Sequence, residues 1–137
     1  MTDEVRTVTV TRDLPFPRDR VWRALTQKEL LAEWLMEGDF APEVGHDFRM
    51  AGDWGHVDCT VLDLEKPERL SYSWEAFDLK SVVTFTLETV EGGTRLVMEQ
   101  TGFTAEQSQA FHGARAGWTA FLARLEEVLR GGAGQEG

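Results

Sequence analysis

A chain of 137 residues, with 42% hydrophobic and 28% charged side chains, has the composition of one ordinary globular domain. Fourteen basic residues against 24 acidic ones give a net charge of −10, and no local cluster of basic side chains offsets it, so we expect no nucleic-acid partner. The sequence contains no internal repeat or linker, which predicts a single domain over residues 1–130 and a disordered tail at 131–137.

No hydrophobic run is long enough to predict a membrane partner. The longest, LLAEWLM at residues 30–36, is far shorter than the roughly 18 residues of a membrane-spanning helix. The first ten residues, MTDEVRTVTV, lack the basic and apolar regions of a signal peptide. Cys59 is the sole cysteine, so the chain forms no internal disulfide. We therefore expect a cytoplasmic protein.

The chain begins with a predicted strand and two short helices. Residues 6–14 alternate between apolar and polar side chains, which predicts a β-strand that the PFP segment ends. Apolar residues recur at helical spacing within RDRVWRALT and predict a helix at 18–26. The TQKE sequence beginning at Thr26 has the form of a capping box, in which two side chains bond each other's backbone N–H groups. It predicts a second helix that runs through Trp34.

The hydrophobic period then changes to two, which predicts about five antiparallel strands. Apolar and polar residues alternate in HDFRMAG, HVDCTVLDLE, ERLSYSWEA, LKSVVTFTLETV and TRLVMEQT. Turns such as GDWG and EGGT are short, so the strands they join are antiparallel neighbours. The alternation predicts that one face of the sheet is covered and the other faces water.

A long helix is predicted to complete the fold. The TAEQ sequence at Thr104 is a second capping box, and the helix that it opens ends near Arg130, before two glycines. About 26 residues at 1.5 Å each span roughly 40 Å, enough to cross the sheet. Because no other predicted element could cover the one-sided sheet, the order of elements predicts an α+β fold with a curved sheet wrapped around this helix.

Two glycines within the long helix need an explanation. Gly113 and Gly117 each cost a helix about 1 kcal/mol relative to alanine, yet Trp118 and Phe121 lie close by in the sequence. A thin stretch of helix either lets the backbone pack closely against the sheet or leaves a cavity between them. Periodicity alone does not choose between these two interpretations.

Several segments together resemble a known superfamily. They are PFPRDRVWRALTQKELLAEWL, VLDLEKPERLSYSWE, EGGTRLVMEQTGF and the later pattern GW...L..LE..L. In this order, over residues 6–130, they resemble the SRPBCC or START-like superfamily, and most of all its branch named for the activator of the Hsp90 ATPase (AHSA1-like). The resemblance implies a helix-grip fold, in which a curved antiparallel sheet wraps around a long C-terminal helix and leaves a hydrophobic tunnel. It therefore favours the cavity.

Inward-facing strand residues and the thin side of the helix are the candidates to line such a tunnel. The predicted lining residues are Trp34, Phe48, Met50, Cys59, Tyr72, Trp74, Val83, Phe85, Met98, Gln100, Phe103, His112, Gly113, Gly117, Trp118 and Phe121. Tyr72, Gln100, Trp74 and His112 would supply its polar groups. Each aromatic residue has an alternative role as ordinary core packing, and Cys59 is expected to be an inert buried thiol.

Neither a metal nor a cofactor is predicted. His46, Asp47, Asp53, His56 and Asp58 flank one hairpin, but their spacing matches no structural zinc pattern and His56 and Asp58 lie on the polar strand face. The glycine-rich stretches EGGT and RGGAGQEG do not join a strand to a helix and lack the lysine of a phosphate-binding loop.

The sequence is compatible with three functions. The first is binding of a small hydrophobic molecule, such as a lipid or an aromatic, polyketide-like compound, in the tunnel. The second is an enzyme of the cyclase, aromatase or hydrolase kind that some superfamily relatives represent, with Tyr72, Gln100 and His112 as its polar groups. The third is stimulation of a chaperone ATPase, as the branch name suggests. The chain lacks the additional N-terminal domain of the eukaryotic co-chaperones, so we do not expect a chaperone partner.

The sequence does not decide the oligomeric state. Trp54, at a predicted hairpin tip, and Phe40, in the loop after the second helix, are candidates either for gate residues or for contacts in a homodimer.

Overall fold

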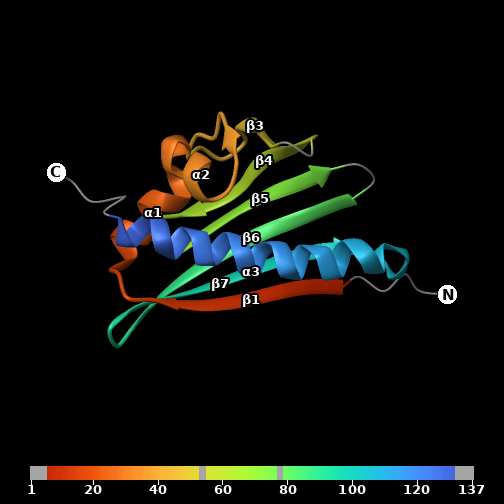
Figure 1. Ribbon diagram of the computed structural model, residues 1–137. Coiled ribbons are helices and arrows are strands. Elements are labelled where there is room, and N and C mark those ends of the chain that lie inside the picture. Colours follow the sequence, from red (N-terminus) through yellow and green to blue (C-terminus); the bar gives the residue numbers. More distant parts are fainter. Residues whose placement is uncertain (1–5, 53–54, 77–78, 132–137) are drawn as a thin grey trace.

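A computed structural model of the chain describes residues 6–52, 55–76 and 79–131 (Figure 1). In chain order the elements are β1 (Arg6–Leu14), α1 (Arg18–Thr26), α2 (Lys28–Trp34), β2 (Glu37–Gly38), β3 (Asp47–Gly52), β4 (Gly55–Glu65), β5 (Arg69–Ala76), β6 (Leu79–Val90), β7 (Gly93–Phe103), the 3-10 turn η1 (Ala105–Gln107) and α3 (Ser108–Arg130). The predicted tail after Gly131 and the tip residue Trp54 lie outside these described residues.

The strands form one antiparallel sheet in the order β1-β7-β6-β5-β4-β3-β2. The first strand pairs with the last, so that Val8 lies opposite Gln100, and every other pairing joins strands that are consecutive in the chain. The sheet curves around α3, which runs along its covered face, while α1 and α2 close one end of that face (Figure 1). This architecture confirms the predicted α+β helix-grip fold.

The two predicted capping boxes have different outcomes. Thr104 and Gln107 form the expected box, in which the Gln107 side-chain oxygen accepts a hydrogen bond from the Thr104 N–H at 2.9 Å. The box at Thr26 is wrong: Thr26 is the last residue of α1, and its hydroxyl donates to the Trp22 carbonyl oxygen at 2.8 Å. Because that hydroxyl is already satisfied inside α1, α2 begins after Gln27 without a side-chain cap.

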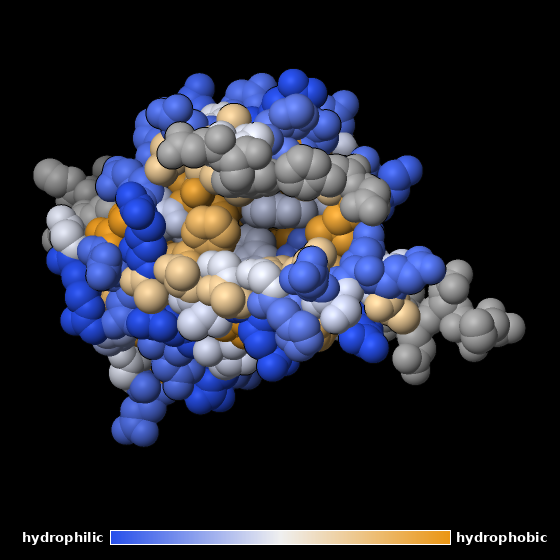
Figure 2. Space-filling view, turned by 45° about the vertical axis from the view of Figure 1, so that its right-hand side comes forward, coloured by the Kyte–Doolittle hydropathy of each residue, from blue (hydrophilic) through white to orange (hydrophobic). Residues whose placement is uncertain are grey.

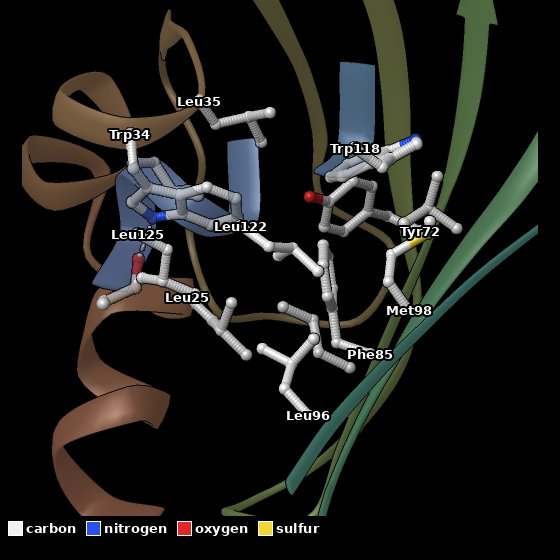
Figure 3. Close-up of a cluster of buried hydrophobic side chains, with 14 of the residues drawn as sticks. Leu25, Trp34, Leu35, Tyr72, Phe85, Leu96, Met98, Trp118, Leu122 and Leu125 are labelled. Atoms are coloured by element: carbon white, nitrogen blue, oxygen red, sulfur yellow. Dashed lines mark hydrogen bonds between the residues drawn. The ribbon is translucent and has the colours of Figure 1, made fainter. Parts of the chain in front are cut away.

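A hydrophobic core fills the space between the sheet and the helices. Its centre joins inward strand residues to one face of α3, together with residues of α1 and α2 (Figure 3). The buried side chains labelled in Figure 3 are Leu25, Trp34, Leu35, Tyr72, Phe85, Leu96, Met98, Trp118, Leu122 and Leu125. Alternation along the strands and helical spacing along α3 bring these side chains to the same layer.

Polar contacts fasten the C-terminal half of α3. Arg12 of β1 pairs with Glu126 at 2.9 Å, and Arg124 donates to the Glu33 carbonyl oxygen at 2.6 Å. Arg20 of α1 donates to the Leu129 carbonyl oxygen at 2.5 Å. The helix is thus tied both to an edge of the sheet and to α1 and the end of α2. Within the described part of the chain, no helix has the length and apolar character needed to cross a membrane.

Candidate functional site

A pocket of about 500 Å³ lies beside the N-terminal half of α3. The helix contributes its small-residue side together with two aromatic residues: Ala110, Gly113, Ala114, Gly117, Trp118 and Phe121. The opposite wall comes from β5, β6 and β7, which contribute Trp74, Ala76, Leu79 and Gln100. Met36, between α2 and β2, completes it. Figure 2 shows a hollow on this side of the molecule, with apolar and weakly polar residues inside it and along its lower rim and hydrophilic residues farther out.

The two helix glycines leave open space. A Cβ atom built on Gly113 or Gly117 meets no described atom within 4 Å. By contrast, a Cβ atom on Gly38 would lie 2.6 Å from the Arg49 carbonyl oxygen, as is typical of a glycine that permits close backbone approach. Gly113 and Gly117 therefore do not allow close packing of α3 against any described part of the chain, and the thin side of the helix faces the pocket.

Aromatic rings form the deep wall of the pocket. Trp118 is 2% exposed, and its ring centroid lies 5.2 Å from that of Trp74 and 5.5 Å from that of Phe121. It also meets Phe85 edge to face at 5.7 Å, which attaches the wall to the hydrophobic core. Tilted and edge-to-face contacts at these distances are favourable, so the rings support one another's orientation.

A chain of hydrogen bonds fixes this wall. The Trp118 indole Nε1 donates to Oε1 of Gln100 at 2.8 Å, and the Gln100 side-chain amide donates to the Ser81 hydroxyl at 2.9 Å. Ser81 in turn donates to the Trp74 carbonyl oxygen at 2.8 Å. Gln100 is 1% exposed and Ser81 5% exposed. Buried polar groups need such partners, and these hydrogen bonds supply them without any charged residue.

Of the residues predicted to line a tunnel, the structure brings one group together around this pocket: Trp74, Gln100, Gly113, Gly117, Trp118 and Phe121. A second group is buried in the core, away from the pocket lining: Trp34, Phe48, Met50, Cys59, Tyr72, Val83, Phe85, Met98 and Phe103. His112 is exposed on α3 and does not line the pocket. The pocket therefore occupies only one part of the expected inward surface.

The core group is held by its own contacts. The Trp34 indole donates to the Ala24 carbonyl oxygen at 2.8 Å, between α1 and α2. Phe103 packs edge to face against Phe111 at 5.7 Å. Burial raises the pKa of the Cys59 thiol to about 12, which keeps it protonated and unreactive near neutral pH.

Tyr72 has an unusual environment. Its side chain is fully buried, and its hydroxyl has no hydrogen-bond partner among the described residues. The ring packs against Phe48 at 5.3 Å and Phe85 at 6.0 Å, and Figure 3 shows the hydroxyl pointing away from the sheet. Burial raises the pKa of this phenol well above its ordinary value. The hydroxyl is thus held neutral in an apolar environment.

The polar groups of the enzyme hypothesis do not converge. His112 is exposed on α3, Tyr72 is enclosed in the core, and the amide of Gln100 is already bonded to Trp118 and Ser81. A general acid or base must come within about 3 Å of the group with which it exchanges a proton. The described positions of these three residues do not form such an arrangement.

Sequence reasoning missed part of the lining. Ala76 and Leu79 continue the inward faces of β5 and β6 to their ends, and Ala110 and Ala114 share the helix face of the two glycines. Continuing the alternation to the ends of the two strands, and following the helical spacing of the glycine face, would have found these four residues. Met36 follows α2 in a segment without a regular pattern, so no signal in the sequence pointed to it.

The hairpin residues considered as metal ligands have other partners. The His46 ring Nε2 lies 2.8 Å from the Asp39 carbonyl oxygen, and Asp47 accepts a hydrogen bond from the Thr60 hydroxyl at 2.6 Å. Asp58 pairs with Arg49 at 2.7 Å and lies 3.9 Å from His56. Asp53 lies outside the described residues.

Phe40, proposed as a gate residue or a dimer contact, is neither exposed nor at the pocket. It is 4% exposed and packs edge to face on Phe48 at 5.1 Å, which makes it part of the core. The same expectation for Trp54 falls outside the described residues.

Comparison with known proteins shows the family to which the chain belongs. The sequence model described as activator of Hsp90 ATPase homolog 1-like protein (AHSA1) matches residues 15–130. The chain belongs to the AHSA1 family. The resemblance seen in the sequence is thereby confirmed. None of the curated proteins matches the chain.

Solved structures share the AHSA1 fold described here. Protein MLL2253 from Mesorhizobium loti is 48% identical, with a TM-score of 0.89 over 91% of this chain and 97% of that one. CalU16 from Micromonospora echinospora is 28% identical, with a TM-score of 0.82 over 93% of this chain and 76% of that one. DynU16, a protein in the dynemicin biosynthetic locus, is 26% identical, with a TM-score of 0.85 over 93% of this chain. The alignment covers 48% of DynU16.

Proposed function

We propose that this AHSA1-family protein binds a small hydrophobic molecule in the pocket between α3 and the strands β5, β6 and β7. The observation that carries the proposal is the open space beside Gly113 and Gly117, where a helix gives up about 1 kcal/mol per residue without gaining a closer contact. A ligand that occupies this space would account for the two glycines, because it would make contacts there that no described side chain makes.

The character of the pocket supports the same function. Its volume of about 500 Å³ falls in the ordinary range for small-molecule sites. Its wall is apolar and aromatic, and burial of apolar surface on binding contributes roughly 25 cal/mol per Å². The hydrogen bond between Trp118 and Gln100 holds the wall in place before a ligand arrives, which reduces the entropy lost on binding. The neighbour DynU16 comes from a biosynthetic locus, a setting in which small molecules are handled.

A thermal-shift panel of fatty acids, flavonoids, sterols and aromatic polyketides tests the proposal. A ligand at a hundredfold excess over its Kd stabilises the folded protein by about 2.7 kcal/mol, which raises Tm by several degrees. Gly117→Leu should abolish the shift because its side chain enters the pocket. Ala116→Leu is the matched control, since Ala116 is exposed on the same helix and does not line the pocket.

The two variants make the outcome decisive. The proposal predicts that wild type and Ala116→Leu respond to the same ligands, while Gly117→Leu remains folded and does not respond. Absence of any shift across the panel, or an equal shift in Gly117→Leu, would show that this pocket is not a ligand site.

A further inference from the structure

The described lining of the pocket carries no charged side chain. Gln100 is its one polar side chain, and the other lining residues are alanine, glycine, leucine, methionine, phenylalanine and tryptophan. A carboxylate that enters such a pocket loses water without gaining a cationic partner. Transfer of an unpaired charge into an apolar site is far costlier than transfer of a neutral group.

Gln100 is poorly placed to compensate such a charge. Its side-chain oxygen accepts from the Trp118 indole at 2.8 Å, and its amide nitrogen donates to Ser81 at 2.9 Å. Turning the amide toward a ligand anion would break these bonds and leave the buried indole N–H of Trp118 without a partner. Loss of a buried hydrogen-bond partner is costly and would offset much of the favourable contact between the amide and the anion.

The electrostatic field of the whole chain also disfavours the binding of anions. With 24 acidic and 14 basic residues, the protein carries a net charge of −10. Such a field disfavours the approach of anions to a site on its surface. Trp74, Trp118 and Phe121, whose neighbouring ring centroids lie 5.2 and 5.5 Å apart, all line the pocket, and Phe121, which is only partly buried, has ring surface left to contact another aromatic ring.

From these observations we infer that the pocket selects uncharged aromatic molecules and rejects carboxylates of the same size. This inference rests on the proposed binding function and deepens it, because it removes fatty-acid anions and aromatic acids from the candidate ligands. Selection operates through the described lining residues, none of which is charged, with Gln100 acting as a positioning residue that holds Trp118 in the wall.

A matched pair of probes tests the inference. 2-Naphthamide and 2-naphthoate have the same ring system and similar size, and at pH 7.5 they differ in charge. We expect isothermal titration calorimetry to show that the wild-type protein binds 2-naphthamide at least tenfold more tightly than 2-naphthoate. Gly117→Leu should bind neither probe, which places both measurements in the pocket.

Two lysine variants distinguish the effect of the pocket lining on anion binding from the effect of the overall net charge. Ala110 lines the pocket on an exposed turn of α3, so Ala110→Lys adds an ammonium group at its edge. We expect this variant to bind 2-naphthoate at least fivefold more tightly than wild type. Ala116→Lys makes the same change in net charge outside the lining and should leave the affinity for 2-naphthoate within twofold of the wild-type value.

The outcomes distinguish this inference from the proposed function. If both probes bind wild type with similar affinity and Gly117→Leu abolishes both, the pocket is a ligand site but the selection against anions is wrong. If 2-naphthamide does not bind while an aliphatic ligand does, the aromatic preference is wrong. An equal gain in affinity for 2-naphthoate in Ala110→Lys and Ala116→Lys would show that overall charge, and not the pocket lining, determines the selection. Failure of both probes and of the whole panel would overturn the binding function itself.

Discussion

At the scale of single residues, Gln100 connects the pocket to the core. It accepts a hydrogen bond from Trp118 and donates one to Ser81, and all three side chains are buried. A glutamine in this position is costly to bury alone, but with both ends of its amide paired it orients a tryptophan ring. The residue therefore contributes to both stability and the shape of the site.

We expect Gln100→Leu to lower the free energy of unfolding by about 2 kcal/mol, because it leaves the buried indole N–H of Trp118 without an acceptor and removes the amide that donates to the Ser81 hydroxyl oxygen. Urea unfolding measures this loss. In a Trp118→Phe background the indole N–H is absent, so the same substitution should cost about 1 kcal/mol less. Equal costs in the two backgrounds would show that the hydrogen bond between Gln100 and Trp118 contributes no coupling.

Two buried acidic groups, the Cys59 thiol and the Tyr72 phenol, should make the protein less stable in alkaline solution. Burial raises the pKa of Cys59 from 9.0 to about 12 and raises the pKa of Tyr72 well above 10.0. Above pH 9 the unfolded chain releases the thiol proton and above pH 10 the phenol proton, while the folded chain retains both. The unfolded state then binds fewer protons, so the free energy of unfolding falls as pH rises, by up to about 1.4 kcal/mol per pH unit for each group.

Urea unfolding between pH 8 and pH 11 measures this slope, and the double variant Cys59→Ala, Tyr72→Phe should flatten it. Tyr72 is the sole tyrosine of the chain, so its absorbance at alkaline pH reports the phenol directly. A phenol that ionises at its ordinary pKa in the folded protein would contradict the burial described here.

At the scale of elements, α3 has two halves with different tasks. Its C-terminal half supplies Leu122, Leu125 and Leu129 to the core and is fastened by Arg12 and Arg124. Its N-terminal half carries the two glycines and borders the pocket. One helix thus closes the core at one end and leaves space at the other.

Replacing the glycines by alanine tests this division. Because a Cβ atom at Gly113 or Gly117 meets no described atom within 4 Å, we expect Gly113→Ala and Gly117→Ala each to raise the free energy of unfolding by about 0.5–1 kcal/mol. Gly38→Ala is the contrasting variant, since its Cβ would lie 2.6 Å from the Arg49 carbonyl oxygen, and it should destabilise. A loss of stability in the helix variants would indicate that α3 is closely packed at the glycines.

Local patterns predicted the elements better than the site. Period-two alternation located β6 at residues 79–90, and helical spacing located α1 at residues 18–26. The box at Thr26 failed because a local pattern does not show whether α1 has already used the hydroxyl.

The pocket lining was only partly predictable for a related reason. Alternation shows which strand residues point inward, but not what covers them. Phe48 points inward as Trp74 does, yet Phe40 packs on Phe48 from a loop that carries no periodic signal, so that part of the sheet is core. The aromatic and small residues of α3 gave a sharper signal, because two interior glycines in a helix require a reason.

At the scale of the whole molecule, the net charge of −10 opposes the compact state. The ion pairs on the surface, such as Arg95 with Asp13 at 2.9 Å, are exposed and each contribute little. We therefore expect Tm to rise between 20 mM and 300 mM sodium chloride, because salt screens the repulsion among the excess acidic groups. Differential scanning fluorimetry measures the shift. A fall in Tm over this range would show that attractive pairs outweigh the repulsion.

A crystal structure of the protein with 2-naphthamide bound would show directly whether the space beside Gly113 and Gly117 holds a ligand. We expect electron density for the naphthalene rings between the glycine face of α3 and the wall formed by Trp74 and Trp118, with the Trp118–Gln100 hydrogen bond intact. Side chains filling that space, or the probe bound elsewhere with the pocket closed, would contradict the account.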